Sequence, residues 1–118
     1  MAEVAKRHNL LLLIDNTFAS PWGCKPLEMG VDLVIHSTTK YLGGHSDILG
    51  GAVVGSKDLI AQIFMRKVHF GAAPDPHSCY LLERGMRTLD VRMPRICENA
   101  HQLAVRLEDH AAIERVYH

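Results

Sequence analysis

The sequence predicts an α/β fold that is incomplete on its own. Two short apolar runs, residues 10–14 and 31–35, are typical of strands buried on both faces of a parallel sheet. A third short strand is expected at residues 50–55, with three helices after it. Because such strands need helices on both faces and too few helices lie between them, we expect the 118-residue chain to be part of a larger fold.

The first half of the chain is expected to alternate strands with short irregular connections. Residues 2–8 have the composition of the last turns of a helix, without a capping residue before them. Prolines and glycines between residues 21 and 30 predict turns, with one helical turn among them. Residues 37–46 contain adjacent glycines and are expected to form a polar loop.

The second half is predicted to be helical. Ser56 is suited to cap a helix that extends to about Arg66, and Asp75 followed by Pro76 is a typical helix start. The apolar spacing of this next helix extends to Met93, where Pro94 is expected to introduce a kink. A last helix is expected over residues 96–111.

Composition narrows the classes of partner and the compartment. The chain has 13 basic and 13 acidic residues, so it lacks the positive charge that binding to nucleic acid or to an anionic membrane requires. Its longest pure apolar run is far shorter than the roughly 20 residues of a membrane-spanning helix. Cys24, Cys79 and Cys97 are widely spaced, which favours reduced thiols in a cytoplasmic protein.

Two polar clusters follow the first two predicted strands. Asp15-Asn16-Thr17 ends the first strand, and residues 37–40, Ser-Thr-Thr-Lys, follow the second. Ligands of open α/β sheets bind outside the carboxyl ends of strands. Pyridoxal phosphate (PLP) requires a lysine amine for its aldehyde, a carboxylate for its pyridine nitrogen and hydroxyl donors for its phosphate. The two clusters together contain these three kinds of group.

The run of residues 31–47, Val-Asp-Leu-Val-Ile-His-Ser-Thr-Thr-Lys-Tyr-Leu-Gly-Gly-His-Ser-Asp, resembles the PLP-attachment signature of the Cys/Met-metabolism enzymes. The resemblance extends from residues 15–18 to residues 84–89 and 116–117. It implies the large domain of the aspartate aminotransferase-like fold (fold type I). It also implies that Lys40 carries the cofactor and is the catalytic base, that Asp15 pairs with the pyridine nitrogen, and that Ser37 and Thr39 bind the phosphate.

The resemblance carries further expectations about the whole protein. Residues 1–93 would belong to the large PLP-binding domain, and residues 94–118 would start the C-terminal domain. The parent would be a cytoplasmic homotetramer, a dimer of dimers, that acts at Cγ of sulfur amino acids. We expect a C–S lyase of the cystathionine or methionine gamma-lyase type, with cystathionine gamma-synthase or a homoserine-ester sulfhydrylase as the alternative. The family's substrate-binding arginine lies outside this chain, so we expect the chain alone to be inactive.

Other interpretations of the same residues stay open at this point. Ser37-x-x-Lys40 also matches the motif of acyl-serine hydrolases, although that motif opens a helix. A truncated, non-catalytic chain would keep the motif without the site. No metal site is expected, because His36, His45 and Asp47 have no recognised ligand spacing. A basic run is expected to form a solvated or interface surface; it comprises Arg84, Arg87, Arg92 and Arg95.

Overall fold

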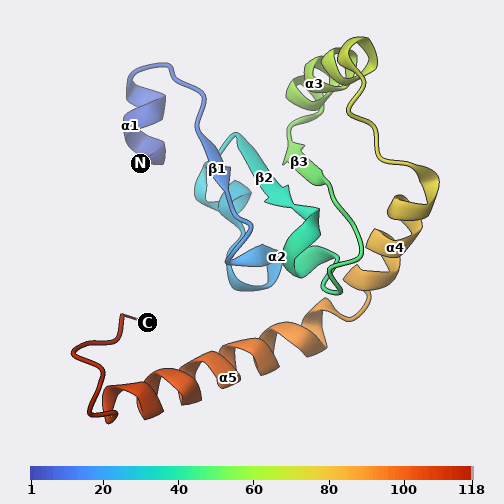
Figure 1. The fold of residues 1–118 in the computed structure, drawn as a ribbon. Coiled ribbons are helices and arrows are strands. Elements are labelled where there is room, and N and C mark those ends of the chain that lie inside the picture. Colours follow the sequence, from blue (N-terminus) through green and yellow to red (C-terminus); the bar gives the residue numbers. More distant parts are fainter. Residues whose placement is uncertain (118) are drawn as a thin grey trace.

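A three-stranded sheet lies at the centre of the structure, a computed structural model that describes residues 1–117 (Figure 1). The strands β1 (Leu13–Asp15), β2 (Leu33–Ser37) and β3 (Gly51–Gly55) are hydrogen-bonded in that order. β1 and β2 are parallel, with Asp15 opposite Ile35. β2 and β3 are antiparallel, with Ser37 opposite Gly51.

The antiparallel third strand corrects the expectation of a parallel sheet. A parallel return needs a crossover of a dozen or more residues, usually an α-helix. Residues 38–50 instead form one tight turn and a loop, so the chain reverses and β3 runs back along β2. The strands also begin later than predicted, since β1 starts at Leu13 and β2 starts at Leu33. The backbone just before β1 is held by the Asp32 carboxylate, which accepts a hydrogen bond from Leu12 N–H at 2.8 Å.

Helices α3 and α4 begin at their predicted caps, whereas the last helix begins at Leu89 and not at residue 96. They are α1 (Ala2–Arg7), α2 (Ser20–Gly23), the 3-10 turn η1 (Pro26–Met29), the π-type turn η2 (Thr38–Leu42), α3 (Lys57–Phe70), α4 (Pro76–Met86) and α5 (Leu89–Glu108). Ser56 caps α3 by accepting from Leu59 N–H at 3.4 Å. Asp75 caps α4 by accepting from the N–H groups of His77 and Ser78, at 2.9 and 3.1 Å. The presence of η2 corrects the expectation of a plain polar loop at residues 37–46.

The break between the last two helices lies at residues 87–88 and not at Pro94. The Thr88 hydroxyl donates to the Gly85 carbonyl at 3.1 Å, which satisfies an acceptor at the carboxyl end of α4. α5 continues through Pro94, although proline cannot donate an intrahelical hydrogen bond. The predicted domain boundary between residues 93 and 94 therefore falls inside a continuous helix, and it stays a prediction.

The chain is more extended than a self-contained domain of its length. Its radius of gyration is 17.7 Å, whereas a compact domain of this size has about 13 Å. Strand β1 is not covered on both faces within this chain, since Leu13 is 50% exposed; Phe18 and Val91 are 81% and 72% exposed. Faces this apolar and open are typical of surfaces that pack against further protein.

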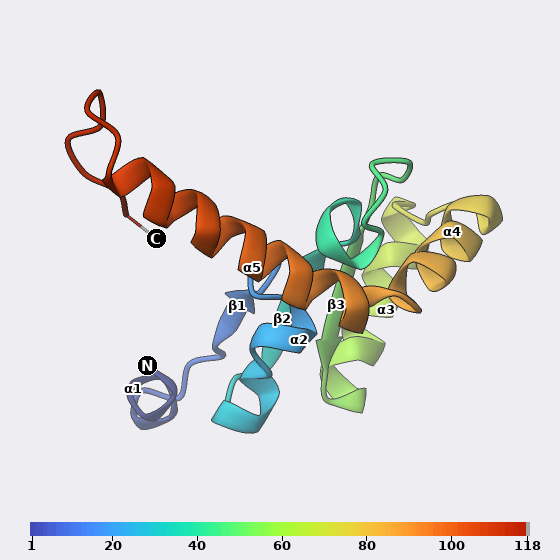
Figure 2. The ribbon, with the colours of Figure 1, turned by 90° about the horizontal axis from the view of Figure 1, so that it is seen from below.

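Helices α4 and α5 pass along the end of the sheet where β1 and β2 finish (Figures 1 and 2). The first turns of α5 lie beside α2 and η2, and Met93 is buried there. A side chain at Gly85 of α4 would overlap the carbonyl oxygen of Gly43, which follows η2. The junction of α4 and α5 is thus seated directly on the turn that contains Lys40.

Two further properties concern the whole of the described chain. Cys24, Cys79 and Cys97 form no disulfide within residues 1–117. Within residues 1–117, no helix is both long enough and apolar enough to cross a membrane.

Candidate active site

The two polar clusters meet at one edge of the sheet. Asp15 is the last residue of β1, and Ser37 is the last residue of β2. Because the two strands are neighbouring and parallel, their carboxyl ends lie side by side. Lys40 follows in η2, three residues beyond the end of β2.

Thr17 joins the ends of the two strands. Its backbone N–H donates to Asp15 Oδ1 at 2.9 Å, which closes a tight turn after β1. Its hydroxyl oxygen accepts from the backbone N–H of Ser37 at 2.8 Å. Between them, Asn16 is buried and donates its amide to the carbonyls of Ser20 and Cys24, at 3.1 and 2.9 Å. The backbone that bears Asp15 is therefore fixed relative to the backbone that bears Ser37.

The Asp15 carboxylate is exposed and ionised at neutral pH. Hydrogen bonding from the side chain and backbone of Thr17 holds the pKa of this carboxyl below its ordinary value of 3.8, and the charge of the nearby His36 acts in the same direction. A permanently charged carboxylate at a strand end is a suitable acceptor for a protonated ring nitrogen.

The turn η2 gives Lys40 its position. Lys40 has φ −90° and ψ −126°, so the helical path is broken at this residue and its side chain is exposed. Before it, Thr38 N–H donates to the Gly50 carbonyl at 2.9 Å, and Thr39 accepts from Gly50 N–H at 3.1 Å. Because the Thr39 oxygen serves as acceptor in this contact, its hydroxyl proton is free to donate to a ligand.

His36 lies behind the polar edge, in the strand next to Asp15. It is only 4% exposed, and its Nδ1 is a buried atom without a hydrogen-bond partner in residues 1–117. Burial lowers the pKa of this imidazole below its ordinary value of 6.5, although the Asp15 charge opposes the effect. His36 also lines a cavity of about 220 Å³ together with Asn16 and Val34. The imidazole that lies behind this edge is therefore neutral at neutral pH.

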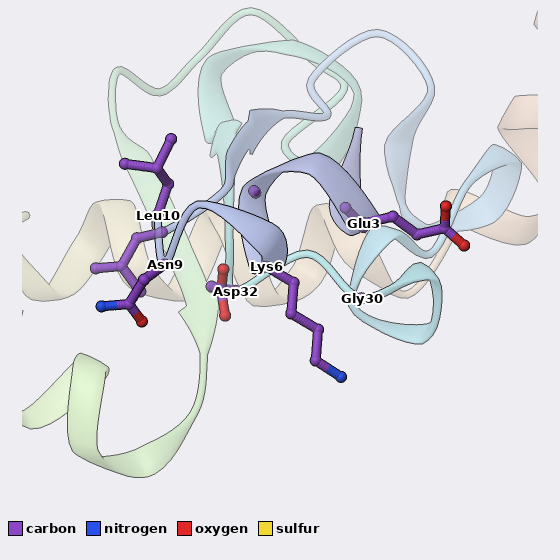
Figure 3. A pocket seen from close by; sticks show the side chains of 9 residues that line it. Glu3, Lys6, Asn9, Leu10, Gly30 and Asp32 are labelled. Atoms are coloured by element: carbon purple, nitrogen blue, oxygen red, sulfur yellow. The ribbon is translucent and has the colours of Figure 1, made fainter.

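A larger cavity lies at the opposite end of the sheet. It has a volume of about 610 Å³ and is lined by residues that include Glu3, Lys6, Asn9 and Asp32 (Figure 3). Asp32 already accepts the Leu12 N–H, so this carboxylate serves the backbone. We place the candidate site at the edge with Asp15 and Lys40, because residues with an amine, a charged carboxylate and hydroxyl groups lie at or just after the carboxyl ends of two neighbouring parallel strands.

The residues at this edge fit pyridoxal phosphate. Lys40 offers an exposed primary amine, and Asp15 offers a carboxylate that stays charged. Ser37 and Thr39 offer hydroxyl groups on the two sides of a buried residue, Thr38. These are the donor types that the cofactor's aldehyde, ring nitrogen and phosphate require.

The competing interpretations find less support in the structure. Ser37 and Lys40 do not share a helix face, because Ser37 ends a strand and the helical path breaks at Lys40. His45 uses its Nδ1 in a 2.8 Å contact with the Gly43 carbonyl. Within residues 1–117, no three His, Cys, Asp or Glu side chains are grouped as they would be around a metal ion.

Two features of the site were missed by sequence reasoning. Thr17 appears in the motif only as a neighbour of Asp15, and its contact with Ser37 spans 20 positions in the chain. Arg92 was expected on a solvated or interface face, which is wrong: its guanidinium donates to the carbonyls of Tyr41 and Gly85, both at 2.8 Å. Neither contact has a signal in local sequence spacing, because both depend on tertiary pairing.

Comparison with known proteins gives a consistent result. The model of a protein family described as "Cys/Met metabolism PLP-dependent enzyme" matches residues 1–118. The chain is 50% identical to cystathionine beta-lyase of Coxiella burnetii, covering 100% of this chain and 31% of that protein. It is 44% identical to cystathionine gamma-lyase of Bacillus subtilis, covering 100% and 31%. The crystal structure of cystathionine gamma-lyase from Lactobacillus plantarum, complexed with L-serine, has a TM-score of 0.95 at 44% identity and covers 98% and 31%.

The chain spans about 30% of the length of the relatives it matches. Other matching relatives are named L-methionine gamma-lyase or cystathionine gamma-synthase. The solved structure belongs to a PLP-dependent lyase of fold type I, so the predicted fold class is confirmed.

The contact between Thr17 and Ser37 yields a prediction about stability. In the intact protein, Thr17→Val removes the acceptor of the Ser37 N–H while keeping the shape of the side chain. We expect the free energy of unfolding to fall by about 1–3 kcal/mol, the cost of a buried unsatisfied donor. Thr17→Ser keeps the hydroxyl and serves as the matched control. Chemical denaturation of both variants checks this, and equal stability of Thr17→Val and wild type would contradict it.

Proposed function

The chain belongs to the family of Cys/Met metabolism PLP-dependent enzymes, and from this premise we propose that its parent protein is a carbon–sulfur lyase that acts at Cγ of a sulfur amino acid. The observation that carries the proposal is the position of Asp15 and of the Lys40 turn at the same edge of the sheet, where β1 and β2 end. The relatives named L-methionine gamma-lyase, cystathionine gamma-lyase and cystathionine gamma-synthase support reaction at Cγ, whereas the relative named cystathionine beta-lyase supports C–S chemistry in general.

We assign each residue at the edge one role. Lys40 binds the cofactor covalently through Nζ. Asp15 keeps a proton on the ring nitrogen, because its carboxyl stays charged at neutral pH. Ser37 and Thr39 donate their hydroxyl protons to the phosphate. The strand register and the Thr17–Ser37 hydrogen bond support this assignment, since they join the backbone after Asp15 to the backbone of Ser37, which leads into Thr39 and Lys40.

The bound cofactor supplies an electron sink that makes the Cα proton of an amino acid acidic. With the cofactor bound, the Lys40 amine would remove that proton as a general base. The same flexible side chain would then remove a proton from Cβ and give a proton to the leaving sulfur, because a lysine amine on a four-carbon stem reaches neighbouring atoms. Asp15 retains its charge throughout and keeps the ring nitrogen protonated.

The alternative activity uses the same residues. In cystathionine gamma-synthase or a homoserine-ester sulfhydrylase, a thiol would be added at Cγ after the leaving group departs. A relative named cystathionine gamma-synthase, from Mycobacterium leprae, is 45% identical to this chain, which keeps this alternative open. We further propose that the parent is a cytoplasmic homotetramer; the free thiols support the compartment and the exposed apolar faces support assembly.

The attachment residue can be tested directly. In the intact protein loaded with pyridoxal phosphate, borohydride reduction followed by peptide mapping is expected to find the cofactor on Lys40. Lys40→Ala should lose the label. Lys25→Ala is the matched control, because Lys25 is an exposed lysine that pairs with Glu28 at 3.8 Å, and it should keep the label. Cofactor on any other lysine of the wild-type protein would refute the assignment.

The reaction is tested by the products formed from cystathionine. Cleavage at Cγ gives cysteine, 2-oxobutyrate and ammonia, which is the expected result for the intact protein. Homocysteine and pyruvate would instead indicate cleavage at Cβ. Synthesis of cystathionine from an acylated homoserine and cysteine, without cleavage, would favour the synthase. Exchange of amino groups with no reaction at Cβ or Cγ would contradict the whole proposal.

A further inference from the structure

Arg92 links three parts of the chain that are distant in sequence. From the first turns of α5, its Nη1 donates to the carbonyl of Tyr41 at 2.8 Å and its Nη2 to the carbonyl of Gly85 at 2.8 Å. Its Nε donates to the Thr88 hydroxyl at 2.9 Å. That hydroxyl in turn donates to the Gly85 carbonyl at 3.1 Å. One guanidinium therefore holds η2 against the carboxyl end of α4.

Two glycines near the Arg92 guanidinium allow the turn η2 and the α4–α5 junction to approach each other closely. Gly44 has φ +78°, and a side chain there would overlap the Arg92 guanidinium. Gly85 lies so close to Gly43 that a side chain would overlap the Gly43 carbonyl. Glycine is needed at position 85, because a Cβ there would meet the backbone of Gly43, and it is favoured at position 44 by the positive φ.

Arg92 differs from the other arginines near it. Arg87 and Arg95 form ion pairs with Glu83 and Glu98 at 2.6 and 3.4 Å, and their side chains are 75% and 72% exposed. Arg92 is half-buried and donates to backbone carbonyls. A positive charge at the carboxyl end of α4 is favoured by the helix dipole, and the planar fork of arginine reaches several acceptors that a lysine ammonium cannot reach together.

The contact acts on the residue next to Lys40. Tyr41 directly follows Lys40, at the point where the helical path is broken. On the other flank, Thr17 fixes the Ser37 N–H at 2.8 Å. The turn is closed by Gly44 N–H, which donates to the Lys40 carbonyl at 2.8 Å. The hydrogen bond from Arg92 to the Tyr41 carbonyl joins the backbone just after Lys40 to helix α5.

We propose that Arg92 is a positioning residue for Lys40: by joining the Tyr41 carbonyl to the end of α4, it fixes the direction from which the lysine amine reaches the cofactor and the substrate. This inference rests on the proposed function, because it assigns Lys40 as the cofactor-bearing base. Arg92 itself acts only through the backbone of η2. Losing its hydrogen bond to Tyr41 leaves the amine present but poorly oriented.

The test compares Arg92→Met, Arg92→Lys and Arg95→Met in the intact protein. Arg92→Met keeps the apolar stem and removes all donors, and Arg92→Lys keeps the charge without the fork. Arg95→Met is the matched control, on the same helix with an exposed ion pair. Three quantities are measured: the rate at which apoprotein forms the lysine-linked absorbance band with pyridoxal phosphate, the pH midpoint of that band, and kcat and KM.

Both Arg92 variants are expected to attach the cofactor more slowly and to show a shifted pH midpoint. Their kcat should fall roughly 10–100-fold with KM little changed, as expected for a misplaced catalytic group. Arg95→Met should behave as wild type. If Arg92→Met does not fold, Arg92→Lys decides the question by the same three quantities.

Two outcomes would count against the inference in different ways. Wild-type attachment rate, pH midpoint and kcat in the Arg92 variants would overturn it, and so would a lower melting temperature without any change in these quantities. If the wild-type protein itself forms no lysine-linked band, the proposed function fails instead, and the two failures are distinguishable in one set of spectra.

Discussion

The hydrogen bond from the Ser37 N–H to the Thr17 hydroxyl is the contact on which the site depends. The donor and acceptor atoms are 2.8 Å apart, and the bond joins the two parallel strands just beyond their last paired residues, Asp15 and Ile35. It extends the pairing of β1 and β2 past that last pair, into the segments that lead to Asn16 and to the Lys40 turn. The same threonine lowers the pKa of Asp15, so one side chain sets both the geometry and the charge of the edge.

The second flank of the site is fixed by helices that come much later in the chain. Arg92 and the close backbone contact between Gly43 and Gly85 seat the α4–α5 junction on η2. Lys40 therefore lies between a sheet edge and a helix junction, with backbone hydrogen bonds on both sides. This arrangement leaves its side chain exposed while its backbone is held, which suits the two roles that we propose for Lys40, carrying the cofactor and moving protons.

The sequence predicted the elements that local chemistry controls. The caps at Ser56 and Asp75 are confirmed, because capping depends on residues within one turn. The antiparallel direction of β3, the break at residues 87–88 and the π-type turn at Lys40 were missed. The turn is held in part by the contact of Arg92 with the Tyr41 carbonyl, which joins segments distant in sequence. Asp15 and the Lys40 turn were placed at one edge correctly, since parallel strands bring their carboxyl ends together; Thr17 and Arg92 were invisible to spacing.

The central claim is that this edge holds pyridoxal phosphate, with Asp15 on the ring nitrogen. The most direct measurement is ¹⁵N NMR of the intact protein loaded with cofactor labelled at that nitrogen, at neutral pH. We expect a protonated nitrogen in the wild-type protein and an unprotonated one in Asp15→Asn, because the Asp15 carboxyl stays charged under these conditions. A nitrogen with the same protonation state in both proteins would contradict it.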